Sequence, residues 1–198
     1  MEEKTLYGYA WNKVYRVQSL RESGVVFEKI TLIEDIKFNV SYFDSVCSMN
    51  VLNTTPYHYL KRIDGSLTNK FLPDYFTLNA ERVFLVLEQY KNWGMCTEEV
   101  RRILANIYVR YLFSALQRNC DKRSNMNHAQ RKEWLKQQYK TPLCKELLSA
   151  VQASGTLFKC MAKAFCAGNI PLCLMIARSI FAVKSAFPTV FSTLKQQH

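Results

Sequence analysis

Apolar and polar positions follow two different patterns along this chain, and the change between them falls near residue 70. In the first part, short runs rich in aromatic and β-branched residues predict strands at 48–52 and 56–60. Segments with helical spacing predict helices over 17–23 and 34–44. Because strands that alternate with helices are typical of α/β structure, we expect an α/β arrangement in this part.

A polar, turn-prone stretch at 64–74 is followed by a longer part in which only helical spacing is evident. There we predict a helix over 79–92, with Asn79 as its N-cap, and a second helix capped by Thr97. The apolar residues of that second helix recur at the three-and-four spacing of one buried face: Val100, Ile103, Leu104, Ile107, Tyr108, Tyr111, Leu112 and Ala115.

Three more helices are predicted towards the C-terminus. One covers residues 127–140, the next begins at Pro142, which suits the first turn of a helix, and the last covers 170–185. The sequence therefore predicts two domains, an α/β part over residues 1–72 and a mostly α-helical region over residues 73–198.

Basic residues are concentrated in the second half of the chain. The net charge is +11, and residues 101–198 carry 16 Lys and Arg against 3 Asp and Glu. A one-sided basic surface attracts polyanions, either nucleic acid or the anionic lipid of a membrane surface. Nucleic acid is disfavoured because the aromatic residues of this half fall mainly on apolar helix faces, and the sequence has no zinc finger, RNP motif or Gly-x-x-Gly loop.

The sequence has no signal for secretion or for crossing a membrane. Its start lacks a basic patch followed by an apolar run, and its longest strongly apolar stretch, 170–177, is far shorter than the ~20 residues of a spanning helix. We therefore expect a cytoplasmic protein, which its basic half could hold peripherally on the inner face of the membrane. The seven cysteines form no Cys-x-x-Cys pair and favour reduced core residues over a metal site.

Two adjacent carboxylates, Glu34 and Asp35, stand where a loop becomes a helix. Acidic residues in a first helical turn are common because they complement the helix dipole. A carboxylate held near a hydroxyl group could instead take its proton as the hydroxyl attacks an electrophilic carbon, which is general-base catalysis. The residues alone leave both interpretations open.

Four short motifs, which follow one another along the chain, give more information about function. They are Trp-Asn-Lys-x-Tyr-Arg at 11–16, Gly-Val-x-Phe at 24–27, Glu-Asp-x-x-Phe-Asn at 34–39, and Tyr-x-Tyr-x-x-Arg-x-x-x-Ser-x-Thr at 57–68. In this order and spacing they resemble the second half of the family 2 glycosyltransferases that build bacterial surface polysaccharides. Residues 1–70 carry the resemblance, and the helical remainder is similar only in general character.

The resemblance implies that residues 1–72 are the remnant of a GT-A type α/β domain. It implies a nucleotide-sugar donor, a polysaccharide or lipid-linked glycan acceptor, and an inverting transfer with Asp35 as the base. The other implied site residues are Glu34, Trp11, Asn12 and Lys13 for the acceptor, and Lys61 and Arg62 for a phosphate group. Trp11 could also be a core aromatic residue, and Lys61 and Arg62 could be the solvated end of a strand.

The sequence departs from the family pattern before Trp11, where the apolar strand, the nucleotide-binding loop and the aspartate-rich metal motif do not appear. The complete family enzyme uses a divalent cation, Mg²⁺ or Mn²⁺, to stabilise the leaving diphosphate. We expect this chain to bind no such ion alone, and to be inactive unless another polypeptide supplies the missing N-terminal half. The alternative is a non-catalytic remnant whose basic helical half binds a membrane surface or a partner protein.

Overall fold

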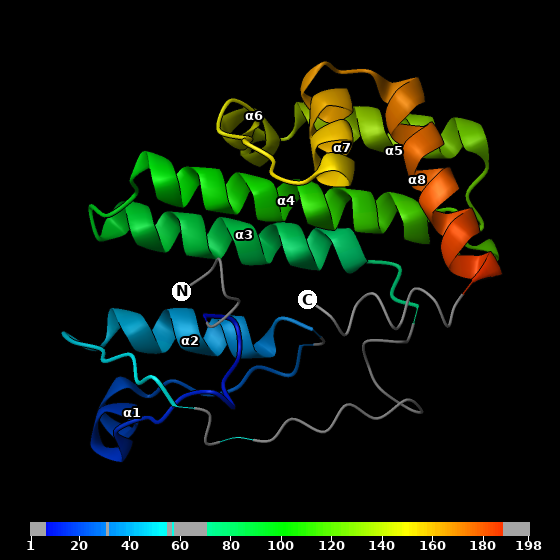
Figure 1. The fold of residues 1–198 in the computed structure, drawn as a ribbon. Coiled ribbons are helices and arrows are strands. Elements are labelled where there is room, and N and C mark those ends of the chain that lie inside the picture. The colour runs from blue at the N-terminus through cyan, green and yellow to red at the C-terminus, as the bar shows by residue number, and fades with distance from the viewer. Residues whose placement is uncertain (1–6, 31, 55–56, 58–70, 188–198) are drawn as a thin grey trace. The chain divides into compact units, whose positions relative to one another are not determined.

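A computed structural model describes residues 7–30, 32–54, 57 and 71–187 (Figure 1). The described residues form helices joined by turns and loops. The helices are α1 (Val17–Ser23), α2 (Glu34–Asp44), α3 (Tyr75–Asn92), α4 (Glu98–Arg118), the 3-10 helix η3 (Lys122–Ser124), α5 (His128–Lys140), α6 (Pro142–Leu148), α7 (Thr156–Cys166) and α8 (Ile170–Ala186).

The predicted α/β fold is wrong for this structure, because the described residues contain helices and no strand. The predicted strand at 48–52 is exposed and irregular. Its apolar residues, such as Val51 and Leu52, form a strand only where a neighbouring strand pairs with the backbone and a core covers one face, and the described residues supply neither to this segment. Of the second predicted strand, 56–60, only Tyr57 lies within the described residues.

The chain divides into two compact units, unit 1 (Met1–Ile103) and unit 2 (Leu104–His198). The helix α4 begins in unit 1 and gives its larger part to unit 2. The domain boundary predicted between residues 72 and 73 rests on a change of sequence pattern and stays a prediction.

Unit 1 is built around the contact between α2 and α3. The helix α2 buries Ile36, Asn39 and Phe43, which share a face at the spacing of three and four residues. From α3, the buried side chain of Gln89 donates to the carbonyl oxygen of Val40 at 2.7 Å and to the carboxylate of Asp44 at 2.8 Å. These bonds satisfy backbone and side-chain acceptors at the end of α2 and fix its position against α3.

Unit 2 has its core on one face of α4. The buried residues of that face recur at three and four: Leu104, Ala105, Tyr108, Val109, Leu112, Phe113, Ala115 and Leu116. Among the remaining helices, α8 contacts both α5 and α7, and α5 also contacts α6. Burial of these apolar faces is the main stabilising contribution, since each fully buried large side chain is worth about 1.5–3 kcal/mol.

Local sequence signals explain where several helices begin. Asn127 caps α5 with a capping box, in which its side chain accepts from the N–H of Gln130 and the Gln130 side chain accepts from the N–H of Asn127. Pro142 opens α6, as its fixed φ angle favours. None of the helices in the described part of the chain combines the length and the apolar character needed to cross a membrane.

Candidate functional site

The predicted base, Asp35, lies in the first turn of α2 and is half-buried. Its Oδ2 atom accepts a hydrogen bond from the backbone N–H of Ala10 at 3.3 Å. This bond joins the start of α2 to the segment that contains Trp11, Asn12 and Lys13. The structure therefore brings Asp35 next to Ala10, which directly precedes the predicted acceptor-binding residues Trp11, Asn12 and Lys13 in the sequence.

A second set of hydrogen bonds joins α2 to the segment before it, one helical turn after Asp35. Asn39 is fully buried, and its Nδ2 donates to the carbonyl oxygen of Tyr7 at 2.8 Å. Its Oδ1 accepts from the hydroxyl group of Tyr15 at 2.6 Å. Burial is the main cause that raises the pKa of Tyr15, and the nearby carboxylate of Asp35 raises it further. The Tyr15 hydroxyl group therefore stays protonated and able to donate.

Between these two sets of hydrogen bonds the chain presents an exposed stack of three aromatic rings, here called the aromatic stack: Tyr9, Trp11 and Tyr57. The ring centroids of Tyr9 and Trp11 are 5.1 Å apart, as are those of Trp11 and Tyr57, and both pairs are stacked. The three residues are 38%, 39% and 52% exposed. Trp11 is therefore a surface residue, and the alternative of a core aromatic does not hold.

Polar groups border the aromatic stack. The ammonium group of Lys13 donates to the carbonyl oxygen of Tyr9 and, at 2.8 Å, to Oδ1 of Asn12. Glu34 precedes Asp35, and its Oε2 atom is buried with no hydrogen-bond partner among the described residues. This atom has no exposed surface, so a ligand does not reach it in this arrangement, and the role of Glu34 towards an acceptor stays a prediction.

The remaining predicted site residues cannot be placed. Lys61 and Arg62 lie outside the described residues, so their role towards a phosphate group stays a prediction. Within the part of the chain that the structure describes, no three His, Cys, Asp or Glu side chains come together as metal ligands. A divalent cation remains an expectation for the complete family enzyme.

Sequence reasoning gave no role to Tyr9, Tyr15, Asn39 or Tyr57. The aromatic residues at 9 and 11 are a signal that this segment is ring-rich, but the sequence does not show that these two are exposed while Tyr7 is buried. The contact between Trp11 and Tyr57 joins residues 46 positions apart, and no local pattern indicates it. No family model, curated protein or solved structure matches this chain.

Proposed function

We propose that unit 1 carries the acceptor-binding part of a glycosyltransferase, with the aromatic stack as the surface on which the glycan lies. The observation that carries the proposal is an exposed stack of aromatic rings beside a half-buried carboxylate. Aromatic faces bury the apolar C–H face of a sugar ring, and carboxylate and amide groups bond its hydroxyl groups. Both kinds of group lie together here.

In the proposed reaction Asp35 is the base. A hydroxyl oxygen of the acceptor attacks the anomeric carbon of the donor sugar, the bond to the nucleoside diphosphate breaks, and the carboxylate of Asp35 takes the hydroxyl proton. Glu34, whose side chain is half-buried at the start of α2, is the second carboxylate proposed to act on the acceptor. The role proposed here for unit 1 is acceptor binding.

Replacing Trp11 with alanine tests this proposal. We expect binding to an oligosaccharide selected on an array of bacterial surface glycans to weaken by about tenfold or more, because the substitution removes the middle ring of the stack. Isothermal titration calorimetry with that oligosaccharide would measure the change.

Trp93→Ala is the matched control, because Trp93 is also an exposed tryptophan of unit 1 and lies at the end of α3. It should bind the same oligosaccharide within about twofold of the unsubstituted chain. An equal loss in both variants, or an array on which the unsubstituted chain binds nothing, would count against the proposal.

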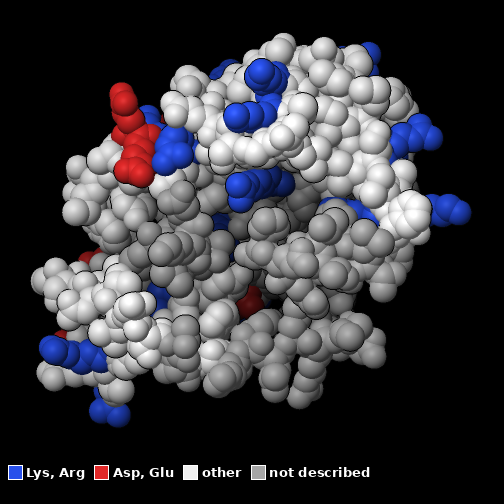
Figure 2. Space-filling model, viewed as in Figure 1, with Lys and Arg blue, Asp and Glu red and all other residues white. Residues whose placement is uncertain are grey.

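A second candidate function is attachment to an anionic membrane surface, and one feature of unit 2 favours it. Residues 147–187 contain no Asp or Glu. Over this stretch, α7 and α8 expose large apolar side chains together with basic ones: Leu157, Lys159, Lys163, Met175, Arg178, Val183 and Phe187. In the view of Figure 2, basic side chains are spread over the surface where these helices lie. Apolar and basic groups on one surface suit a peripheral position on an anionic leaflet.

We expect the chain to sediment with vesicles that contain phosphatidylglycerol and to stay in solution with vesicles of phosphatidylcholine alone. Raising the salt concentration to about 0.5 M should release it, because salt screens exposed charges. The double substitution Lys159→Gln, Lys163→Gln should weaken binding by about thirtyfold, since each basic residue is worth about 1 kcal/mol near the surface.

The control for this experiment is Arg21→Gln with Lys29→Gln, which removes two exposed charges from unit 1. It should leave vesicle binding within about twofold. Equal binding to neutral vesicles would refute the proposal, and binding to DNA without binding to vesicles would favour nucleic acid as the partner.

A further inference from the structure

Unit 2 contains a pocket of about 220 Å³ where α5 and α8 begin. Its apolar wall comes from α8, through Pro171, Leu174 and Met175. The rest of its lining is basic or sulfur-bearing: His128 and Arg131 from α5, Arg178 from α8, and Cys120 from the turn after α4. The pocket therefore combines one apolar wall with up to three cations.

The guanidinium groups of Arg131 and Arg178 both exert an electrostatic effect on the thiol group of Cys120. Both Arg131 and Arg178 lie close enough to the thiol group of Cys120 to oppose the rise that burial causes in its pKa. The effect of burial is larger than the effect of the two arginines, so the pKa of Cys120 is raised and the thiol stays neutral. Its Sγ atom donates to the carbonyl oxygen of Leu116 at 3.4 Å. The thiol thus adds no negative charge to the pocket.

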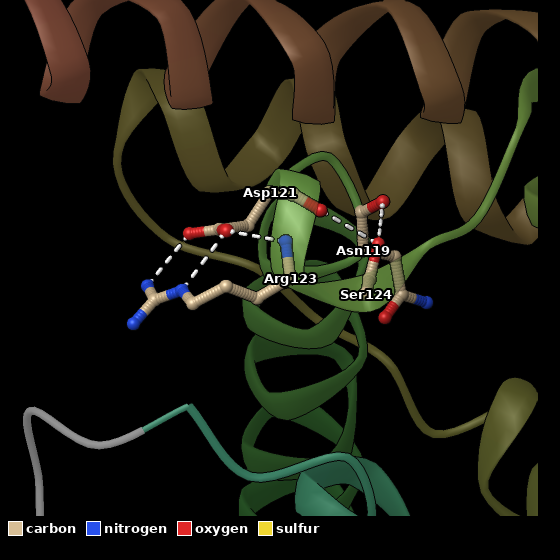
Figure 3. Close-up of polar contacts among 4 residues, drawn as sticks. All are labelled: Asn119, Asp121, Arg123 and Ser124. Carbon is tan, nitrogen blue, oxygen red and sulfur yellow. Dashed lines mark hydrogen bonds and ion pairs between the residues drawn. The ribbon is translucent and has the colours of Figure 1, made fainter.

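The acid next in sequence to Cys120 does not neutralise these arginines. Figure 3 shows the carboxylate of Asp121 held by Arg123, whose Nη2 donates at 2.7 Å, whose Nε donates at 3.0 Å and whose backbone N–H donates at 2.9 Å. These bonds lower the pKa of Asp121 to about 2, so the carboxylate remains ionised and paired with Arg123. No acid is among the described residues that line the pocket.

Arg131 and Arg178 both have N–H donors that are available to a ligand. Arg131 uses Nη1 to donate to the carbonyl oxygen of Asn119 at 3.1 Å, and a guanidinium group has five N–H donors. Arg178 has no hydrogen bond or ion pair with any residue that the structure describes, although it faces the same pocket. The first residue of α5, His128, also lies there, so the positive end of that helix dipole adds to the potential.

The size of the pocket limits its ligand. Pockets for drug-sized molecules measure about 300–1,000 Å³, so this one accommodates only a small group and a short apolar portion. Met175 is 59% exposed while it lines the pocket, which leaves a path along α8 for a longer apolar chain. Two converging guanidinium groups suit the oxygens of a phosphate group, and the wall of Leu174 and Met175 suits a hydrocarbon chain.

We propose that this pocket binds a single lipid phosphate, with the phosphate group on Arg131 and Arg178 and the start of the hydrocarbon chain against Leu174 and Met175. The proposal goes beyond attachment to a charged membrane surface, because it assigns a defined pocket and one ligand chemistry. It is also independent of the aromatic stack in unit 1.

Titration calorimetry of the full chain with dihexanoyl phosphatidic acid, kept below its critical micelle concentration, tests the proposal without a membrane. We expect saturable binding with one molecule per chain. Inorganic phosphate and hexanol, which carry the anion and the chain separately, should each bind about tenfold more weakly or worse. Absence of saturable binding to the phosphatidic acid, or equal binding of inorganic phosphate, would overturn the proposal.

Arg178→Gln should weaken binding of the phosphatidic acid by about tenfold or more, because it removes one of the two phosphate contacts. The side chain of Arg178 is exposed, so the variant should keep its helical circular dichroism spectrum and its melting temperature. Lys145→Gln removes an exposed charge from α6 outside the pocket and should change binding by less than about twofold. Equal losses in the two variants would show general charge attraction and refute a pocket. Binding of the soluble phosphatidic acid without vesicle binding would support the pocket and refute the surface, and vesicle binding without binding of the soluble phosphatidic acid would do the reverse, so the two proposals fail separately.

Discussion

Phe165→Ala is expected to lower the free energy of unfolding of unit 2 by about 3–5 kcal/mol, because it leaves a cavity in a tightly packed core. Phe165 is fully buried on α7, and its ring stacks on Tyr139 of α5 with centroids 4.7 Å apart. The hydroxyl group of Tyr139 also donates to the carbonyl oxygen of Phe165 at 2.7 Å. The ring of Phe165 thus joins two helices that lie apart in the sequence.

Urea unfolding followed by the fluorescence of Trp134 would measure this effect. The chain has three tryptophans and only Trp134 lies in unit 2, so a background of Trp11→Phe and Trp93→Phe makes the signal specific to that unit. Tyr139→Phe keeps the ring and removes the hydroxyl group, and should cost only about 1 kcal/mol. Phe187→Ala, at an exposed position after α8, should cost less than about 0.5 kcal/mol. Similar losses for Phe165→Ala and Phe187→Ala would contradict the assignment of Phe165 to the core.

Asn39→Leu is expected to lower the free energy of unfolding of unit 1 by about 2–4 kcal/mol. Leucine has a similar volume but leaves the carbonyl oxygen of Tyr7 and the hydroxyl group of Tyr15 without the partner they have now. Each such loss in a buried place costs about 1–3 kcal/mol. Glycan binding should weaken as well, because these bonds hold the segment that carries Tyr9 and Trp11.

Hydrogen exchange of the backbone amides of α2 would report the stability of unit 1 directly. Asn92→Leu provides the control, since Asn92 is an exposed asparagine of α3 in the same unit. It should change the protection of α2 by less than about 0.5 kcal/mol. If the amides of α2 were equally protected from exchange in the Asn39→Leu and Asn92→Leu variants, the buried hydrogen bonds of Asn39 would not be what holds the segment with Tyr9 and Trp11 in place.

Helices were more predictable than the fold as a whole. The limits predicted for residues 17–23 and 34–44 agree with α1 and α2, since a glycine ends the first and two acidic residues begin the second. The start of α3 was predicted wrongly at Asn79, which lies inside the helix with its Nδ2 bonded to the carbonyl oxygen of Tyr75 at 2.7 Å. The helix begins earlier because Phe76 is buried and adds a turn to its apolar face.

Other features depend on tertiary contacts and could not be deduced from local sequence. The helix α7 was not predicted, because it starts after Gly155 without a side-chain cap. Of the seven cysteines expected in the core, Cys144 and Cys173 are buried, whereas Cys47, Cys160 and Cys166 are exposed. A cysteine in an apolar segment falls on either side of a helix, and only the packing of neighbouring helices decides which side is covered.

The candidate site shows the same division between local and tertiary information. The position of Asp35 at the start of a helix follows from the sequence pattern. Its contact with Ala10 and the stacking of Trp11 on Tyr57 join distant parts of the chain, so they become visible only in the structure. The resemblance placed Trp11 and Asp35 in one site of a GT-A type α/β domain. The described residues contain no sheet, so that domain prediction is wrong, and the joint role of the two residues stays a prediction.

The absence of acidic residues from 147–187 has a consequence for how this part of unit 2 responds to its surroundings. This stretch also contains no histidine, and its charged side chains are lysine and arginine. The charge of this stretch therefore comes entirely from cationic side chains. A rise in ionic strength should therefore weaken the hold of these exposed side chains on an anion, because dissolved salt screens exposed charges.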